Sequence, residues 1–183
     1  MATKCNHDVF ICFRGIDSRD EFVDYLVESL KRADIVPFTD IITEKGFSIR
    51  AQLLAAIEES RSSIIVMSER FASSTWCLVE LEEILKKKRT SGYPVMPIFY
   101  RVNPSNVRKQ EDKFAQALAE HEEREEDKVQ VDKWKHALAE FGDLVGWVFP
   151  SAHYRLKVLT LSHLLLAIFF CLLNSFQRTL NTK

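Results

Sequence analysis

The sequence predicts an α/β fold in which a parallel β-sheet is covered by helices on both faces. Short, nearly continuous apolar segments alternate with longer segments whose apolar residues have helical spacing, and short links join them. Such strict alternation favours parallel pairing, because each crossover helix returns the chain to the same end of the sheet. With 183 residues, 46% hydrophobic and 28% charged, the chain is long enough for one soluble domain with its own core.

The first strand and helix are expected within residues 8–30. Residues 8–13 (DVFICF) are almost wholly apolar, as in a strand buried on both faces, and Gly15 suits a tight turn after them. Ser18 and Glu21 have the S-x-x-E spacing of a capping box, which marks the start of a helix. Apolar residues then recur at helical spacing: Phe22, Val23, Leu26, Val27 and Leu30.

The same alternation continues to residue 100. Strands are expected at residues 35–38, 63–68 and 95–100. A loop through Gly46 leads into the second helix, and the third helix is expected at residues 76–89. The apolar residues of the second helix are Ile49, Leu53, Leu54 and Ile57.

The helical pattern after Pro104 is more charged. It passes through Phe114 and Leu118 and reaches the charged run 120–128, which is expected to be a solvated helix face and loop. One more amphipathic helix follows, and we expect Gly146 to end it as a C-cap glycine. The apolar residues of that helix are Trp134, Leu138, Phe141 and Val145.

The charges are distributed unevenly along the chain. Its 25 Lys and Arg residues nearly balance 26 Asp and Glu residues, but every acidic residue lies at or before Pro150. The segment up to Pro150 therefore has a net charge of −5, and the remainder has +4. A net-acidic body argues against nucleic acid as the main partner, since phosphate binding needs a basic face. The basic run 86–89 ends a helical pattern, where cations complement the helix dipole.

The cysteines predict reduced thiols. No C-x-x-C pair is present, and no secretory signal pattern precedes the first strand, so a cytoplasmic location is expected. Cys77 is a poor candidate for a nucleophile, because no histidine between His7 and His121 can serve as its base; a half-buried helix thiol is the simpler interpretation. The four cysteines are Cys5, Cys12, Cys77 and Cys171.

Ligands of such folds bind at the carboxyl ends of the strands, so the loop after the first strand is a candidate site. Backbone N–H groups at a helix start, a glycine and two arginines together suit a phosphate or carboxylate. Alternatively, Arg19 pairs with a neighbouring acidic side chain. The loop lacks a G-x-G-x-x-G pattern, which argues against dinucleotide binding as in a dehydrogenase. Its residues are Arg14, Gly15, Ile16, Asp17, Ser18 and Arg19.

The third helix carries a second candidate. Trp76 and Glu80 are four residues apart and share a face, which borders an apolar stripe. Glu82 and Glu83 each have a lysine four residues later and are expected to form surface pairs, whereas Glu80 has Ile84 there. A carboxylate beside an aromatic ring and without a local cation is a candidate site residue. The alternative is a boundary glutamate that points to water.

Five segments resemble a plant-type TIR domain: residues 8–15 (DVFICFRG), 72–81 (ASSTWCLVEL), 97–100 (PIFY), 103–110 (NPSNVRKQ) and 146–147 (GW). The match runs in order from about residue 7 to residue 149 and is similar to the N-terminal domain of plant intracellular immune receptors. It implies a flavodoxin-like three-layer sandwich with a five-stranded parallel sheet. We therefore assign residues 1–150 to a TIR domain and residues 151–183 to a C-terminal tail.

The resemblance also implies an activity. Such domains hydrolyse NAD⁺ at the nicotinamide–ribose bond to give ADP-ribose or cyclic ADP-ribose-type signals in plant defence, and the family's glutamate falls on Glu80. NAD⁺ is then the substrate, with no metal and no other cofactor. One carboxylate suffices, because nicotinamide leaves from a pyridinium that already carries positive charge.

By the same resemblance, the nucleotide lies near the loop after the first strand and the family's tryptophan. The flexible loop 39–48 would come from a neighbouring subunit to close the site, so activity would depend on self-association or on other TIR domains. The residues implied are Arg14, Gly15, Ile16, Asp17, Ser18, Arg19, Trp76, Lys45 and Gly46.

The chain departs from the family pattern at several positions. Asp24 and Tyr25 stand where Ser-His is usual at a self-association face, and the loop 39–48 is less acidic and one residue shorter. Arg101 and Asn103 replace aspartates. Asp24, Tyr25 and the altered loop favour the alternative function, a non-catalytic TIR adaptor that binds receptor TIR domains and modulates immune signalling. A phosphoacceptor receiver does not fit, because no acidic cluster follows the first strand.

The tail is predicted to form a hydrophobic helix. Residues 158–176 would span roughly 28 Å as a helix, just short of a bilayer core, with basic residues on both flanks. A short membrane anchor is the interpretation we favour. The alternatives are a helix docked on the body or on a partner, and read-through sequence from a truncated transcript.

Overall fold

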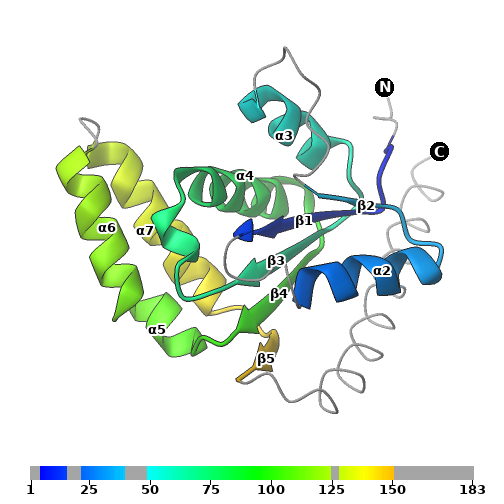
Figure 1. Ribbon diagram of the computed structural model, residues 1–183. Helices are drawn as coiled ribbons and strands as arrows, with labels where there is room; N and C mark the ends of the chain where they lie inside the picture. Colours follow the sequence, from blue (N-terminus) through cyan, green and yellow to red (C-terminus); the bar gives the residue numbers. More distant parts are fainter. Residues whose placement is uncertain (1–4, 16–21, 40–48, 125–127, 151–183) are drawn as a thin grey trace.

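The computed structural model describes residues 5–15, 22–39, 49–124 and 128–150, and its centre is a parallel five-stranded sheet of order β2-β1-β3-β4-β5 (Figure 1). The chain first moves from β1 to β2 and then crosses to β3 on the other side of β1. Ligands of such sheets bind at the carboxyl ends of the strands beside this reversal. The strands are β1 (Val9–Phe13), β2 (Pro37–Phe38), β3 (Ser63–Met67), β4 (Val95–Tyr100) and β5 (Trp147–Phe149).

Helices cover both faces of the sheet (Figure 1). On one face lies α2 (Asp24–Arg32), whose Leu26 and Leu30 are buried against the strands. The other face carries α3 (Ile49–Glu58), α4 (Thr75–Ser91), α6 (Lys113–Arg124) and α7 (Lys128–Gly142). Two short helices, the 3-10 helix η2 (Phe71–Ser73) and α5 (Pro104–Lys109), complete the described elements.

The central strands are buried on both faces, which explains their apolar sequences. All residues of β1 and β3 are buried, and successive side chains enter opposite cores. Phe10 and Cys12 belong to the core beneath α3 and α4, while Ile11 and Phe13 belong to the core beneath α2. The three-layer α/β prediction is therefore confirmed.

Two of the predicted boundaries are wrong. The last described helix ends at Gly142, not at Gly146, and Val145 is 97% exposed. Gly142 lies so close to α5 that a Cβ would be 2.6 Å from the backbone nitrogen of Arg108. The second strand has two residues instead of four, because the Ile35 N–H still donates to the Leu30 carbonyl in the turn that ends α2.

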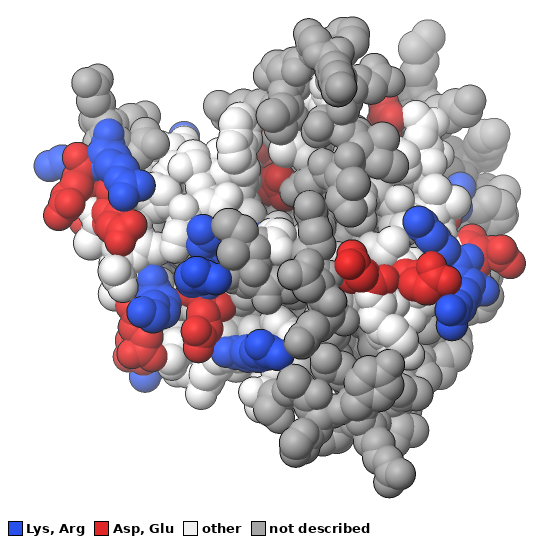
Figure 2. Space-filling view, in the orientation of Figure 1, with Lys and Arg blue, Asp and Glu red and all other residues white. Residues whose placement is uncertain are grey.

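The surface charges are intermixed on the face that Figure 2 shows. Lys and Arg side chains lie beside Asp and Glu side chains on the α6 side and again over α2. Ion pairs also join opposite charges among the described residues, including Arg89–Glu140, Arg108–Asp143 and Lys135–Glu122. Exposed pairs of this kind contribute at most about 1 kcal/mol each, so the core provides most of the stability.

The predicted tail, residues 151–183, lies outside the described residues, as does the hydrophobic helix expected within it. Within the described ranges, none of the helices has the length and apolar character needed to cross a bilayer. The tail's anchoring role stays a prediction.

Candidate functional site

The predicted site residues that the structure describes lie at the carboxyl ends of β1 and β3. Arg14 and Gly15 follow β1 directly, and both are half-buried. The chain leaves β3 at Ser68, passes through η2 and enters α4, which carries Trp76 and Glu80. The fold thus brings four of the predicted residues to the end of the sheet where α/β proteins bind ligands.

The start of α4 is capped by Ser74. The Ser74 hydroxyl accepts a hydrogen bond from the Cys77 N–H at 3.4 Å, and Ser74 has the extended backbone of an N-cap. Trp76 in the first turn is 47% exposed, whereas Glu80 one turn later is 2% exposed. The alternative of a boundary glutamate that points to water is therefore wrong. A buried carboxylate beside a helix N-terminus lies where electrostatic interactions are strong.

Three side chains hold η2 and the start of α4 in place. The Arg14 guanidinium donates a hydrogen bond to the Arg70 carbonyl. The Cys77 thiol, which we expected to be half-buried but which is buried, donates to the Phe13 carbonyl at 3.6 Å. The third is His121 of α6, whose Nε2 lies 2.9 Å from the Ala72 carbonyl oxygen. All three contacts end on backbone carbonyls, so they fix the path of the chain.

Sequence reasoning missed His121. It lies in the charged run that we expected to be solvated, yet it is 5% exposed. The signal was present in the spacing, because Phe114, Ala117 and Leu118 precede His121 by seven, four and three residues and lie on the same buried face. A histidine on that stripe must be bonded or destabilising.

The remaining predicted nucleotide contacts lie outside the described residues: Ile16, Asp17, Ser18, Arg19, Lys45 and Gly46. Within the residues described here, no group of three His, Cys, Asp or Glu side chains could hold a metal ion. The described cysteines Cys5, Cys12 and Cys77 are thiols without a disulfide.

The structure describes four of the positions at which the chain departs from the TIR pattern. Asp24 and Tyr25 are both exposed on α2. Asn103 caps α5, because its side-chain oxygen accepts from the Ser105 N–H at 2.9 Å, so this asparagine keeps a cap that an aspartate could also form. Arg101 has a φ of 56° and lies over the Tyr100 ring at 5.0 Å from its centroid.

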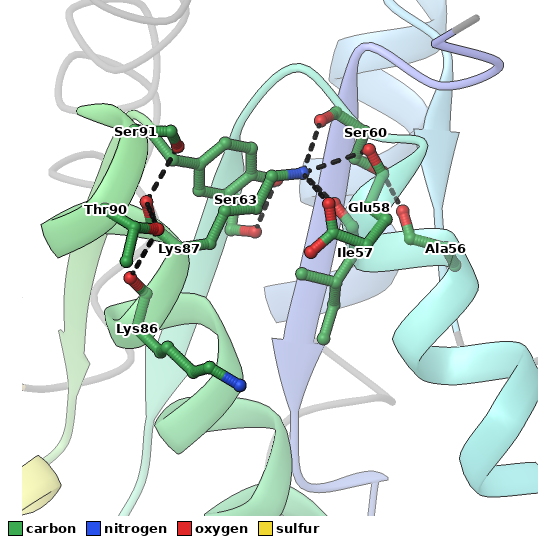
Figure 3. Close-up of polar contacts among 10 residues, drawn as sticks. Ala56, Ile57, Glu58, Ser60, Ser63, Lys86, Lys87, Thr90 and Ser91 are labelled. Carbon is green, nitrogen blue, oxygen red and sulfur yellow. Dashed lines mark hydrogen bonds and ion pairs between the residues drawn. The ribbon is translucent and has the colours of Figure 1, made fainter. Parts of the chain in front are cut away.

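The opposite end of α4 has a different arrangement, centred on Lys87 (Figure 3). The Lys87 ammonium donates to the carbonyls of Ile57 at 2.6 Å, Glu58 at 3.0 Å and Ser60 at 3.5 Å. It also lies 3.6 Å from the Glu58 carboxylate and 4.2 Å from the centroid of the Tyr93 ring. Lys87 therefore caps the carboxyl end of α3. We call these residues the Lys87 clasp.

Burial shifts the pKa values of two residues of the clasp, Lys87 and Tyr93. Burial lowers the pKa of Lys87, and the Glu58 carboxylate opposes this shift. Burial raises the pKa of Tyr93, while its hydrogen bond with the Ser63 hydroxyl, 2.9 Å long, lowers it.

The predicted surface pairs of the third helix need correction. Glu83 pairs with Lys86 at 3.2 Å, because Lys87 is turned inward to the clasp. Glu82 accepts a hydrogen bond from Gln130 of α7. Helical spacing did not predict the partners of Lys87 and Glu82, since α3 and α7 supply them.

A groove of about 500 Å³ lies between α4 and α7. Its lining includes the Arg89–Glu140 ion pair, Val129 and His136, and none of the predicted site residues contributes to it. It is therefore separate from the candidate site at the strand ends.

Comparison with known proteins identifies related sequences and structures. The family model described as TIR domain matches residues 6–180. Disease resistance protein RPV1 of Vitis rotundifolia is 48% identical over 149 residues, which are 81% of this chain and 10% of that protein. TMV resistance protein N of Nicotiana glutinosa is 42% identical over 147 residues, or 79% of this chain and 13% of that protein. The chain thus spans about a tenth of the length of these relatives.

A solved structure shows the same fold. The TIR domains in the structure of the activated Roq1 resistosome, which directly recognises the pathogen effector XopQ, align with a TM-score of 0.81 and 35% identity. The alignment covers 89% of this chain and 99% of that chain.

Proposed function

The chain belongs to the TIR domain family, and on that premise we propose that it is an NAD⁺ hydrolase of plant defence signalling. The proposed reaction cleaves the nicotinamide–ribose bond and yields nicotinamide with ADP-ribose or a cyclic ADP-ribose-type signal. The observation that carries the proposal is the burial of Glu80 at the start of α4, beside the strand ends.

The chemistry requires one buried carboxylate. The electron pair of the glycosidic bond moves to the nicotinamide nitrogen and neutralises its positive charge, so the leaving group needs no proton. The ribose becomes oxocarbenium-like, and the Glu80 carboxylate stabilises that positive charge more strongly in a buried setting than in water. Attack by water then gives ADP-ribose and a proton, while attack by a nucleophilic atom of the same nucleotide gives a cyclic product.

The neighbouring residues have proposed binding roles. The exposed indole of Trp76 offers a flat apolar surface for a planar ring of the substrate. Arg14 and Gly15 lie beside the nucleotide, and the turn 16–19 contributes backbone N–H groups. Lys45 and Gly46, in loop 39–48, complete the site of a neighbouring subunit.

Self-association is part of the proposal. The Roq1 TIR domains belong to a resistosome, and a site completed by a neighbour's loop would be active only in an assembly. Nicotinamide release should therefore rise more steeply than linearly with protein concentration.

The test is nicotinamide release from NAD⁺ by the full chain at high concentration. Glu80→Gln keeps the size of the side chain and removes its charge, and it should lower the rate about 100-fold or more. The matched control is Glu83→Gln on the same helix, where the carboxylate pairs with Lys86 at the surface and should be dispensable. No release by the wild type, or equal rates in the wild type and Glu80→Gln, would refute the enzyme proposal.

The second candidate function is a non-catalytic adaptor for receptor TIR domains. The exposed Asp24 and Tyr25 on α2 favour it, because they replace the usual residues of a self-association face. In that case Glu80→Gln would leave immune signalling in leaves unchanged, while Tyr25→Ala would abolish co-precipitation with a receptor TIR domain.

The place of action is also a proposal. We infer a cytoplasmic protein, with residues 158–176 as a membrane anchor. Carbonate extraction should leave the full chain with the membranes and should release a chain that ends at Pro150. A full chain that is wholly extracted would exclude the anchor.

A further inference from the structure

Two buried residues stand out in the part of the chain that the structure describes. Among its Asp, Glu, Lys, Arg and His residues, only Glu80 and His121 are buried. The reaction proposed above uses Glu80 and assigns nothing to His121. Both residues are nevertheless connected with the same unit, because His121 binds η2 and η2 leads directly into the helix that carries Glu80.

The hydrogen bond of His121 has a defined direction. A backbone carbonyl can only accept, so Nε2 of His121 carries the proton that is donated to Ala72 at 2.9 Å. The imidazole ring also packs against Trp134 of α7 in a tilted arrangement, with ring centroids 5.2 Å apart and planes at 64°. Trp134 is 1% exposed. The imidazole of His121 therefore packs against Trp134 of α7 while its Nε2–H binds the Ala72 carbonyl of η2.

Ala72 lies close to the residues proposed for the reaction. It precedes the Ser74 cap by two residues, Trp76 by four and Glu80 by eight. Its turn is further held by the bond from Arg14 to the Arg70 carbonyl. A shift of η2 would therefore move the first turns of α4 relative to the end of β1.

We propose that His121 is a positioning residue for the nicotinamide-releasing site: its hydrogen bond to Ala72 fixes the turn from which α4 presents Trp76 and Glu80. This inference rests on the proposed function. An apolar residue would fill the same core space without the desolvation cost of a buried imidazole. The bond to the carbonyl offsets that cost and sets the position of the turn.

The experiment compares three variants of the full chain at a temperature where circular dichroism shows each to be folded. His121→Phe keeps a ring against Trp134 and removes the donor. His121→Gln keeps an N–H donor near the position of Nε2. His136→Phe on α7 is the control, because His136 is exposed and bonds only within its own helix, to the Asp132 carbonyl.

The first readout is the kinetics of nicotinamide release. Displacement of a reacting group by about 1 Å can lower a rate up to about 100-fold, so His121→Phe should lower kcat at least tenfold. KM should rise as well, because Trp76, a proposed binding residue, moves with the same turn. His121→Gln should recover most of kcat, and His136→Phe should match the wild type. A purely structural role would not be rescued by glutamine in preference to phenylalanine.

The second readout does not need activity. Fluorine NMR of protein labelled with 5-fluorotryptophan reports Trp76, Trp134 and Trp147 separately. The Trp76 resonance should shift in His121→Phe and return toward the wild-type position in His121→Gln, while Trp147 on β5 stays unchanged.

The outcomes separate the two proposals. A wild type that releases no nicotinamide contradicts the proposed function, and with it the role of His121 in that reaction. An active wild type with unchanged kcat and an unchanged Trp76 resonance in His121→Phe overturns the positioning role alone. Equal losses of kcat in His121→Phe and His121→Gln overturn it as well.

Discussion

The start of α4 is held by three separate side chains that each bond to one backbone carbonyl. Near the end of α4, a single lysine side chain bonds to three backbone carbonyls. The start carries an exposed Trp76 next to a buried Glu80, while the Lys87 side chain at the other end is only 15% exposed. The amino ends of the strands are thus closed by the Lys87 clasp, and the carboxyl ends present side chains suited to a ligand. The difference predicts that substitutions in the Lys87 clasp lower the stability of the fold, whereas substitutions at the start of α4 lower nicotinamide release.

The largest expected effect on stability comes from Lys87→Met. Methionine keeps most of the apolar stem but leaves the carbonyls of Ile57, Glu58 and Ser60 without a charged donor. The free energy of unfolding should fall by about 2–3 kcal/mol, measured by urea denaturation. Nicotinamide release per folded molecule should stay close to that of the wild type.

Lys86→Met is the matched control for this prediction. Lys86 is exposed and pairs only with Glu83 in the contacts described, so the loss should stay below about 0.5 kcal/mol. Equal stability of the two variants would show that the clasp does not stabilise the fold.

Tyr93→Phe gives a prediction about pH. Burial raises the pKa of Tyr93 in the folded protein, so the phenol remains neutral in the fold after it begins to ionise in the unfolded chain near pH 10. Stability linked to this group is therefore complete below pH 10 and is lost as the pH rises toward the folded pKa. Tyr93→Phe lacks this loss, so the advantage of the wild type over the variant should shrink by about 1 kcal/mol between pH 10 and pH 11.

Denaturation of both proteins at several pH values tests this prediction. The other tyrosines titrate in both proteins and cancel in the difference. A constant difference over that range would mean that Tyr93 ionises equally in the folded and unfolded states.

Ser74→Ala examines the other end of α4. It removes the N-cap acceptor for Cys77 and should lower the free energy of unfolding by about 1 kcal/mol. Because this cap lies between Ala72 and Trp76, nicotinamide release should fall as well. Asn103→Ala removes the comparable cap of a different helix, α5, and should lower stability by a similar amount without lowering release. Equal release in the two variants would contradict a special role for the start of α4.

The sequence predicted the elements better than their ends. The buried strands β1, β3 and β4 and helix α4 lie close to their expected ranges, because apolar spacing is a local property of the chain. The end of α7 was misplaced because Val145 has the right spacing for the helix yet is exposed. The helix stops where Gly142 meets α5, a contact that spacing within one helix cannot reveal.

In the candidate site, too, local sequence patterns identified some residues, whereas residues with distant partners were missed. Trp76 and Glu80 were identified from their spacing and from the TIR resemblance, and the fold places them beside the end of β1. His121 and Lys87 were assigned to a solvated run and to a surface pair. Both are turned inward, because their partners come from distant elements.

The sequence by itself determined the alternating strands and helices, the family, and the position of Glu80 on the third helix, since all of these depend on residues close together in the chain. Only the tertiary structure decided which polar side chains meet. His121 binds a carbonyl 49 residues away, and Lys87 binds one 30 residues away. Such contacts depend on how whole helices pack against the sheet, and hydrophobic burial sets that packing with no local signal for the partner of each polar group.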